Sequence, residues 1–440
     1  MPIDSSTSVP IAVPTGWDCV ELDELVEPSR GISYGIVQPG KHQTNGVPIL
    51  RVNNIRRGRI DTTDSMRVSQ TVASKFRRTV LRGGELVLSL VGTLGECAVV
   101  PSDLAGWNVA RAVAVIPLKA GVDPRWVELC LRSAAVQSLM RAWATTTVQA
   151  TLNLRDVRRL PVLYAPQTTR TAITSVSRSI DDKIEQLQRT ASALERLARA
   201  IFRAWTVGFE PVHAKATGAA SFPSMPQEVF DALPTKLVDT NVGGIPDGWT
   251  PGTLGDVAKE IRDGAKPAEI DPATPYIGLE HMPKRSISLN DWEHVAKVTS
   301  NKSRFRAGQI LFGKLRPYFH KVGVAPIDGV CSTDVVVVEP LEASYFGLVL
   351  GVVASDGFVA YTTACSTGTK MPRTKWADMK QFSLVVPQPE VLHALSMITR
   401  SFTDQIVANI HETHALAALR EYLLPELLSG QVRVEGAPNG

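Results

Sequence analysis

The chain has 440 residues, of which 44% are hydrophobic and 20% are charged. That much apolar material excludes a largely disordered chain, and the length corresponds to two to four domains of ordinary size. The 47 basic residues barely outnumber the 43 acidic ones and leave a net charge of +4, which excludes a polybasic tail protein but leaves a nucleic-acid partner open.

Similar motifs recur in the same order in the two halves of the chain. Residues 13–17 (Val-Pro-Thr-Gly-Trp) resemble residues 245–249 (Ile-Pro-Asp-Gly-Trp). Further matches pair residues 47–50 with 274–277, 82–88 with 306–312, 113–118 with 336–341, and 162–167 with 384–388. Ordered matches of this kind predict an internal repeat of two similar folded halves.

Each half begins with short apolar runs separated by turn residues, such as residues 85–90 and 97–100, which predict β-strands. A helical pattern over residues 124–143 follows in the first half, and each half ends in a long helical pattern. We therefore expect an α+β chain in which two similar α/β domains are separated by two long antiparallel helices. The expected segments are a first globular domain (1–165), a long helix (166–206), a linker rich in Pro, Ala and Ser (207–244), a second globular domain (245–388), a second long helix (389–430) and a tail (431–440).

The first long helix has the clearest periodicity in the chain. Apolar residues recur at spacings of three and four from Ile173 to Ile201, and residues 167–205 contain neither glycine nor proline. A rod with one apolar stripe needs a partner surface, so we expect the two long helices to form a coiled coil with an approximate twofold axis. The alternative is that each helix packs only on its own domain. The candidate partner-binding residues on these helices are Ile180, Ile184, Leu187, Leu194, Ile201, Phe202, Trp205, Phe402, Ile406, Ile410, Leu423 and Leu424.

The sequence offers no convincing catalytic or metal-binding pattern. The phosphate-binding pattern GxxxxGK[ST] is absent, and no Pro-Pro dipeptide occurs, although the active-site motif of an adenine methyltransferase would contain one. His411 and His414 are three residues apart, whereas the zinc-protease helix places its histidines four apart. We therefore predict no catalytic residue and no metal site, and we expect Asp181 and Asp182 to be solvated charges or partner contacts.

Cysteine usage and hydropathy give an expected location. The five cysteines are scattered and form no CxxC pair, which favours a reducing cytoplasm over a disulfide framework or a zinc site. No apolar run reaches the length of a membrane helix, and the first residues do not resemble a secretory signal. The expected location is therefore cytoplasmic.

Positive charge gathers locally in both halves. Residues 51–82 hold nine basic residues opposed by Asp61 and Asp64, and residues 302–321 hold six with no acid; a third cluster follows at residues 370–380. Arg and Asn side chains can read base edges, and Lys and Arg neutralise phosphates, so these stretches predict DNA contact; the alternative is a merely solvated face. The candidate DNA-binding residues are Arg51, Asn53, Asn54, Arg56, Arg57, Arg59, Arg77, Arg78, Lys314, Arg316, Tyr318, Lys321, Lys370, Arg373 and Lys375.

Three segments of the chain are distinctive: residues 200–212, with Phe202, Trp205 and the stretch Phe-Glu-Pro-Val at 209–212; residues 244–257, which lead into the second half; and residues 419–430 near the end of the chain. These segments resemble a known family, the specificity (S) subunits of Type I restriction–modification systems. The likeness covers about residues 14–435. Residues 206–208 (Thr-Val-Gly) depart from the family, which often has an aromatic and an acidic residue there.

The resemblance implies a function and a set of partners. Each globular domain would be a target recognition domain that reads one half of a bipartite, asymmetric double-stranded DNA site. The long helices would hold the two domains apart and dock two methyltransferase (modification) subunits, which restriction (motor–nuclease) subunits would join. The chain would have no catalytic site, and S-adenosylmethionine, ATP and Mg²⁺ would belong to the partner subunits of this bacterial or archaeal complex. Two alternatives remain: a stand-alone DNA-modifying enzyme with its own recognition domains, and a coiled-coil scaffold that binds no DNA.

Overall fold

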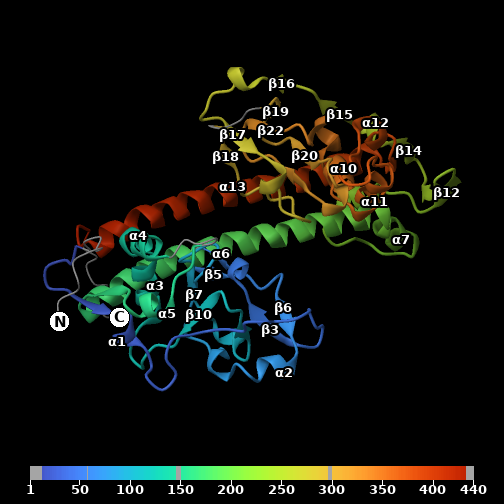
Figure 1. The fold of residues 1–440 in the computed structure, drawn as a ribbon. Helices are drawn as coiled ribbons and strands as arrows, with labels where there is room; N and C mark the ends of the chain where they lie inside the picture. Colours follow the sequence, from blue (N-terminus) through green and yellow to red (C-terminus); the bar gives the residue numbers. More distant parts are fainter. Residues whose placement is uncertain (1–11, 57, 145–149, 296–299, 433–440) are drawn as a thin grey trace. The chain divides into compact units, whose positions relative to one another are not determined.

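Figure 1 shows the computed structural model of the chain, which describes residues 12–56, 58–144, 150–295 and 300–432. The contacts divide the chain into two units, and each unit contains part of both long helices. Unit 1 comprises residues 1–182 and 417–440, and unit 2 comprises residues 183–416. The described residues form a mixture of helices and strands, which confirms the α+β prediction at this coarse level.

Unit 1 is built on a four-stranded sheet of order β2–β10–β7–β8 and a three-stranded sheet of order β6–β3–β9. All residues of β7 and β10 are buried, as expected for strands covered on both faces. Two antiparallel pairs, β1 with β11 and β4 with β5, complete the strands of this unit. The strands are β1 (Asp18–Glu21), β2 (Ser33–Tyr34), β3 (Val47–Leu50), β4 (Ile55–Arg56), β5 (Arg59–Ile60), β6 (Met66–Val68), β7 (Leu86–Ser89), β8 (Cys97–Val99), β9 (Asn108–Val109), β10 (Val113–Ile116) and β11 (Pro161–Tyr164).

The helical pattern predicted over residues 124–143 is two helices in unit 1. Ser133 ends the first helix with extended backbone, and its hydroxyl accepts a hydrogen bond from the Val136 N–H at the start of the second. The first helix is anchored by Trp126, whose buried indole N–H donates to the Leu163 carbonyl at 2.6 Å. The short helices are α1 (Leu22–Leu25), α2 (Gln70–Ala73), α3 (Pro124–Arg132), α4 (Ala134–Trp143) and α5 (Leu154–Arg158).

Unit 2 has a four-stranded sheet of order β15–β23–β20–β21 and a five-stranded sheet of order β16–β19–β22–β17–β18. The pair β14 with β24 and the hairpin of β12 and β13 are separate from these sheets. The strands are β12 (Leu237–Thr240), β13 (Gly243–Pro246), β14 (Thr250–Thr253), β15 (Ala258–Ile261), β16 (Gly264–Ala265), β17 (Pro275–Ile277), β18 (Glu293–His294), β19 (Lys302–Phe305), β20 (Ile310–Gly313), β21 (Val322–Val324), β22 (Gly329–Ser332), β23 (Val335–Pro340) and β24 (Ser383–Val386).

The segment predicted as a linker, residues 207–244, is folded onto unit 2. It forms two short helices and most of the β12–β13 hairpin, because Val212, Met225, Phe230 and Leu233 are buried in the unit 2 core. The short helices of unit 2 are α7 (Glu210–Ala216), α8 (Gln227–Asp231), α9 (Leu254–Val257), α10 (Phe346–Val353), α11 (Asp356–Ala364) and α12 (Trp376–Met379).

The four-stranded sheets of the two units have similar strand orders, β2–β10–β7–β8 and β15–β23–β20–β21, and their pairing can be compared with the sequence matches. Val113 lies opposite Ser89 in unit 1, and Val335 lies opposite Gly313 in unit 2. If Ser89 matches Gly313, as the sequence match of 82–88 with 306–312 implies, then Val113 matches Val335. This is one residue earlier than the sequence match of 113 with 336. Each unit also has a parallel pair, β3 with β9 and β17 with β22.

The two long helices are α6 (Gln167–Phe202) and α13 (Pro389–Leu428), drawn in green and red in Figure 1. Within unit 1, Ile173 of α6 shares a buried cluster with Leu427 and Leu428 of α13. Within unit 2, Ala191 and Ile201 of α6 share the core with Ile406 and Ile410 of α13. In both units the apolar stripe of α6 is therefore packed against α13, as a coiled-coil seam requires.

In the described residues no single helix is long and apolar enough to span a membrane; only residues 343–353 and 356–364, bent by 68°, pass that test as a pair, by length and composition.

Candidate nucleic-acid interface

Unit 2 brings together two basic segments that are about fifty residues apart in sequence. The loop between β20 and β21 contacts the loop before α12 through backbone hydrogen bonds. The Arg316 N–H donates to the Pro372 carbonyl at 2.7 Å, and the Thr374 N–H donates to the Lys314 carbonyl at 3.1 Å. We call residues 314–321 and 370–375 the unit 2 basic loops. Together they form one surface that carries basic and aromatic side chains.

Several side chains of the unit 2 basic loops are accessible to a partner. Tyr318 and Met371 are large apolar groups left exposed, and Lys370 and Lys375 are exposed beside them. Exposed apolar groups among cations are typical of surfaces that stack or pack against bases while lysines meet phosphates. The sequence predicts DNA contacts in each of these two loops, and the fold brings the two loops together.

Other candidates in these loops are engaged inside unit 2. Lys321 donates its ammonium group to the Leu279 carbonyl, and burial, helped by nearby Lys284, lowers the pKa of Lys321. Arg316 donates from Nη2 to the Lys370 carbonyl at 3.2 Å. Lys321 is therefore engaged as a brace of its loop, and its predicted contact with DNA stays a prediction. Arg316 mainly ties one basic loop to the other.

The first basic loop ends in a strained and well-anchored turn. Arg316 and His320 both adopt left-handed backbone angles, with φ of 50° and 52°. His320 is buried, and its Nε2 bonds the Ala354 carbonyl at 2.9 Å, so Nε2 is the protonated nitrogen. The Asp356 carboxylate lies 3.4 Å from Nδ1. Burial lowers the pKa of His320, and the cations Arg199 and Arg285 act in the same direction.

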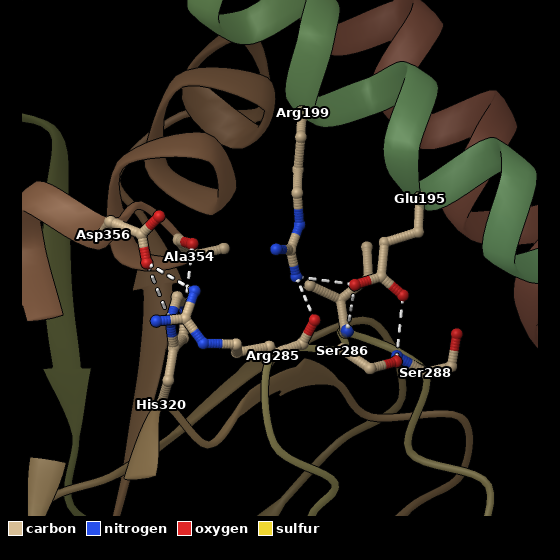
Figure 2. A network of polar contacts seen from close by, with 9 residues as sticks. Glu195, Arg199, Arg285, Ser286, Ser288, His320, Ala354 and Asp356 are labelled. Carbon is tan, nitrogen blue, oxygen red and sulfur yellow. Dashed lines mark hydrogen bonds and ion pairs between the residues drawn. The ribbon is translucent and has the colours of Figure 1, made fainter. Parts of the chain in front are cut away.

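Figure 2 shows how this turn is connected to α6. The Arg285 N–H donates to the His320 carbonyl at 2.8 Å, and the Arg285 carbonyl accepts from Arg199 of α6 at 2.7 Å. Buried Glu195 of α6 accepts hydrogen bonds from the Ser286 hydroxyl at 2.9 Å and from the Ile287 N–H at 3.0 Å. The first basic loop is thus held to the long helix through residues 285–287.

The candidates in unit 1 divide into exposed and engaged residues. Arg56 of the β4–β5 hairpin is exposed, as are Asn53, Arg77 and Arg78. Arg51 forms an ion pair with Asp64 at 3.4 Å. Arg57 lies outside the described residues.

Two unit 1 candidates have structural roles instead. Asn54 is buried, and its amide bonds the Arg51 N–H and the Asp61 carbonyl, which closes its own loop. Arg59 donates from Nη2 to the Asp181 carbonyl of α6 at 2.5 Å. The prediction that Asn54 reads a base is therefore wrong, because every part of its amide is turned inward. Arg59 attaches the hairpin to α6.

The structure also revises the candidate partner-binding residues. Most of them fill the cores of their own units and cannot touch another chain; these are Ile184, Leu187, Ile201, Phe202, Trp205, Ile406 and Ile410. Ile180, Leu194, Phe402, Leu423 and Leu424 are partly buried. The exposed apolar residues of the long helices lie beside this stripe: Leu197 and Met397 in unit 2, and Leu419 and Tyr422 in unit 1. Sequence reasoning missed them because it followed the buried seam.

Two carboxylates take roles that the sequence did not indicate. The Asp181 side chain is only 12% exposed and pairs with Arg420 of α13 at 2.6 Å, so it is not a freely solvated charge. Asp334 pairs with Arg373 of the second basic loop through two hydrogen bonds, at 2.9 Å and 3.3 Å. Both acids lie far in sequence from their partners, so no local pattern could have revealed them.

His411 and His414 fix α13 to the globular part of unit 2. Their Nε2 atoms bond the carbonyls of Pro326 and Asn290, at 3.0 and 2.9 Å, and His414 stacks on Trp292 at 4.2 Å. Over the described residues no group of three metal-ligating side chains is close enough to hold an ion.

The chain was compared with family models, with curated proteins and with solved structures. No family model matches the chain, but individual curated proteins do. The specificity subunit of the Type I restriction enzyme EcoBI from Escherichia coli is 28% identical over 149 residues, which is 34% of this chain and 31% of that protein. The specificity subunit of MjaIX from Methanocaldococcus jannaschii is 21% identical over 80% of this chain and 78% of its own length.

A solved structure shares the fold over nearly the whole chain. The S subunit of the Type I restriction–modification system from M. genitalium has a TM-score of 0.53 at 12% identity, covering 96% of this chain and 98% of that one. The sequence relatives and this shared fold agree with the resemblance found in the sequence. The chain is therefore similar in sequence to Type I restriction enzyme specificity subunits and shares the fold of a solved S subunit.

Proposed function

We propose that the chain is the DNA-recognition subunit of a Type I restriction–modification complex. It binds a bipartite, asymmetric site in double-stranded DNA and directs adenine methylation or restriction by partner subunits, without a catalytic site of its own. The observation that carries the proposal is the similarity to specificity subunits over four fifths of the chain. The exposed cations and aromatic ring of the unit 2 basic loops support it.

The globular parts, residues 1–165 and 245–388, act as two target recognition domains, each reading one half of the site. Their similar strand orders support the proposal that they are two copies of an internal repeat. Their exposed basic residues differ in position: unit 1 carries them on the β4–β5 hairpin and near Arg77, and unit 2 carries them on its basic loops. Different side chains on similar scaffolds are what an asymmetric site requires.

The long helices dock two modification subunits, which restriction subunits join in the bacterial or archaeal cytoplasm. The exposed Leu197 and Met397 in unit 2 and the exposed Leu419 and Tyr422 in unit 1 support one docking surface in each unit. S-adenosylmethionine, ATP and Mg²⁺ bind to the partner subunits. Because the methyltransferase needs its adenine outside the helix, the assembled complex flips that base.

The decisive experiment maps methylated adenines in a host that has no other adenine methylation. Co-expression of the full chain with the modification subunits of its own system should methylate a two-part motif with an unread spacer. The chain alone should methylate nothing. Methylation by the chain alone would favour a stand-alone enzyme, and a gel shift that shows no DNA binding at low salt would favour a scaffold.

A further inference from the structure

Arg373 is held in place at both its backbone and its side chain. Its N–H and carbonyl exchange hydrogen bonds with Thr367, both at 3.0 Å, and it forms a β-bridge with Leu315. Its guanidinium lies side-on against Asp334, with Nε donating to Oδ1 at 2.9 Å and Nη2 donating to Oδ2 at 3.3 Å. The group is therefore oriented before any partner arrives, and binding costs little side-chain entropy.

One edge of this guanidinium remains available. A guanidinium has five N–H groups, and the contact with Asp334 uses the Nε–H and one Nη2–H. The second Nη2–H and both Nη1–H groups remain, and the Arg373 side chain is 49% exposed. These donors form the end-on fork of the guanidinium. In the major groove that fork matches the O6 and N7 acceptors of guanine.

The charge of Asp334 favours a base over a phosphate as the target. The carboxylate offsets the positive charge of Arg373, so the pair offers directed donors with little net attraction for an anion. The lysines beside it, Lys370 and Lys375, are exposed and form no ion pair in the described part of the chain. They supply the uncompensated charge that phosphates need.

We propose that Arg373, positioned by Asp334, reads a guanine in the half of the DNA site that unit 2 binds. The inference rests on the proposed function and adds the chemistry of one recognised base. Asp334 is a positioning residue, since it acts on DNA only through Arg373.

Strand pairing restricts this contact to unit 2. Val91 pairs with Thr151 in unit 1 as Leu315 pairs with Arg373 in unit 2, so Thr151 corresponds to Arg373. The Leu90 N–H donates to the Ala112 carbonyl as the Lys314 N–H donates to the Asp334 carbonyl, so Ala112 corresponds to Asp334. Neither residue of unit 1 can reproduce the pair. The guanine read in this way therefore belongs to one half-site only.

The test selects binding sites from a randomised DNA library with the full chain in complex with its modification subunits. Wild type should select a two-part motif with at least one guanine in the unit 2 half. Arg373→Ala and Arg373→Lys should each lose about 10- to 100-fold discrimination at one guanine and leave the other half unchanged, since neither retains the fork. Lys370→Ala, the matched control, should bind all sites more weakly and keep every base preference.

Asp334→Asn separates positioning from simple loop bracing. The amide cannot hold both guanidinium nitrogens, so the same guanine preference should fall. The freed positive charge should strengthen binding to random DNA and steepen its salt dependence by about one phosphate contact. A brace that only supports the loop would weaken binding to every sequence and would not raise random-DNA affinity.

If the wild-type complex is selective, either of two results would overturn the inference. In the first, Arg373→Lys keeps all base preferences. In the second, both Arg373 variants lose affinity equally at every position of the site while their unfolding temperatures stay unchanged. If Arg373→Ala lowers the unfolding temperature, Arg373→Lys and Asp334→Asn are the variants that test the inference. A wild-type complex that selects no sequence would overturn the proposed function, and this inference with it.

Discussion

At the scale of single residues, the exposed cations of unit 1 should act through phosphates. Arg56, Arg77 and Arg78 are exposed, and no acid pairs with them within the described residues. Replacing Arg56 and Arg57 by Ala should weaken DNA binding about equally for all sequences and reduce the slope of log affinity against log salt by about two contacts. Gel shifts at several salt concentrations measure both quantities. Lys119→Ala is the control, because Lys119 is an exposed cation of the same unit that lies outside the basic stretch 51–82 and donates to the Glu24 carbonyl.

The buried His320 should make the stability of unit 2 depend on pH. Burial lowers its pKa, so the unfolded chain takes up a proton at a higher pH than the folded chain. The stability that neutral His320 contributes is complete above its pKa in the unfolded chain, about 6.5. This stability is lost as the pH falls from there through the lower pKa of His320 in the folded chain. His320→Gln places an amide N–H near the position of Nε2, where it can donate to the Ala354 carbonyl, and has no such titration. Denaturant titrations between pH 8 and pH 5 should therefore show a shallower loss of stability in this variant, and equal slopes would contradict the assignment.

Residue types were easier to predict than residue roles. The sequence shows that residues 51–59 are basic and polar, but Asn54 closes its own loop and Arg59 bonds the backbone of α6. These roles depend on partners such as Asp181, 122 residues away in the chain. Local composition indicates where a charged surface lies. Which of its side chains are free depends on long-range contacts that no window of sequence contains.

At the scale of elements, one buried ion pair joins α6 to α13 in unit 1. The side chains of Arg420 and Asp181 are only 7% and 12% exposed, and their atoms lie 2.6 Å apart. Asp181→Ala would leave the Arg420 charge buried without a partner, which should reduce the free energy of unfolding by about 3–5 kcal/mol. The control is Lys183→Ala in unit 2, since Lys183 joins the same helices through Glu412 at 3.5 Å with both side chains nearly half exposed. That change should cost no more than about 1 kcal/mol.

Denaturant unfolding monitored by helix content measures both variants. If Asp181→Ala and Lys183→Ala have the same free energy of unfolding, the Arg420 charge must be solvated or paired with another residue in the Asp181 variant. Assembly with the modification subunits should also suffer in the Asp181 variant, because the α6–α13 pair would lose its register in unit 1.

The elements themselves differ in how far the sequence predicts them. A stripe with spacings of three and four predicts α6, which the structure places at Gln167–Phe202, because helix periodicity is a local property. Strands of two residues, such as β2 and β16, leave no periodic signal and exist only through their pairing. The Pro- and Ala-rich segment before β13 is folded because four of its apolar residues reach the unit 2 core, a tertiary effect.

At the scale of the whole molecule, the proposed recognition domains should be exchangeable. Residues 250–385 lie entirely within unit 2 and begin and end at the β14–β24 pair, so a swap with a relative preserves both long helices. The hybrid should change one half of the methylated motif and keep the other half and the spacer. Mapping of methylated adenines measures all three at once, and a change in both halves would contradict a modular arrangement.

The long helices should set the length of the unread spacer. The division between the units falls at residues 182 and 183 within α6 and at residues 416 and 417 within α13. Seven residues inserted at both points leave the α6–α13 contacts inside each unit intact. They add about 10 Å of helix at 1.5 Å per residue, or up to about three base pairs at 3.4 Å. A methylated motif with the same two halves and a longer spacer is the expected result. Insertion in α6 alone is the control, and it should abolish assembly because the helices no longer match in length. An active double-insertion variant with an unchanged spacer would show that something other than helix length determines the spacing.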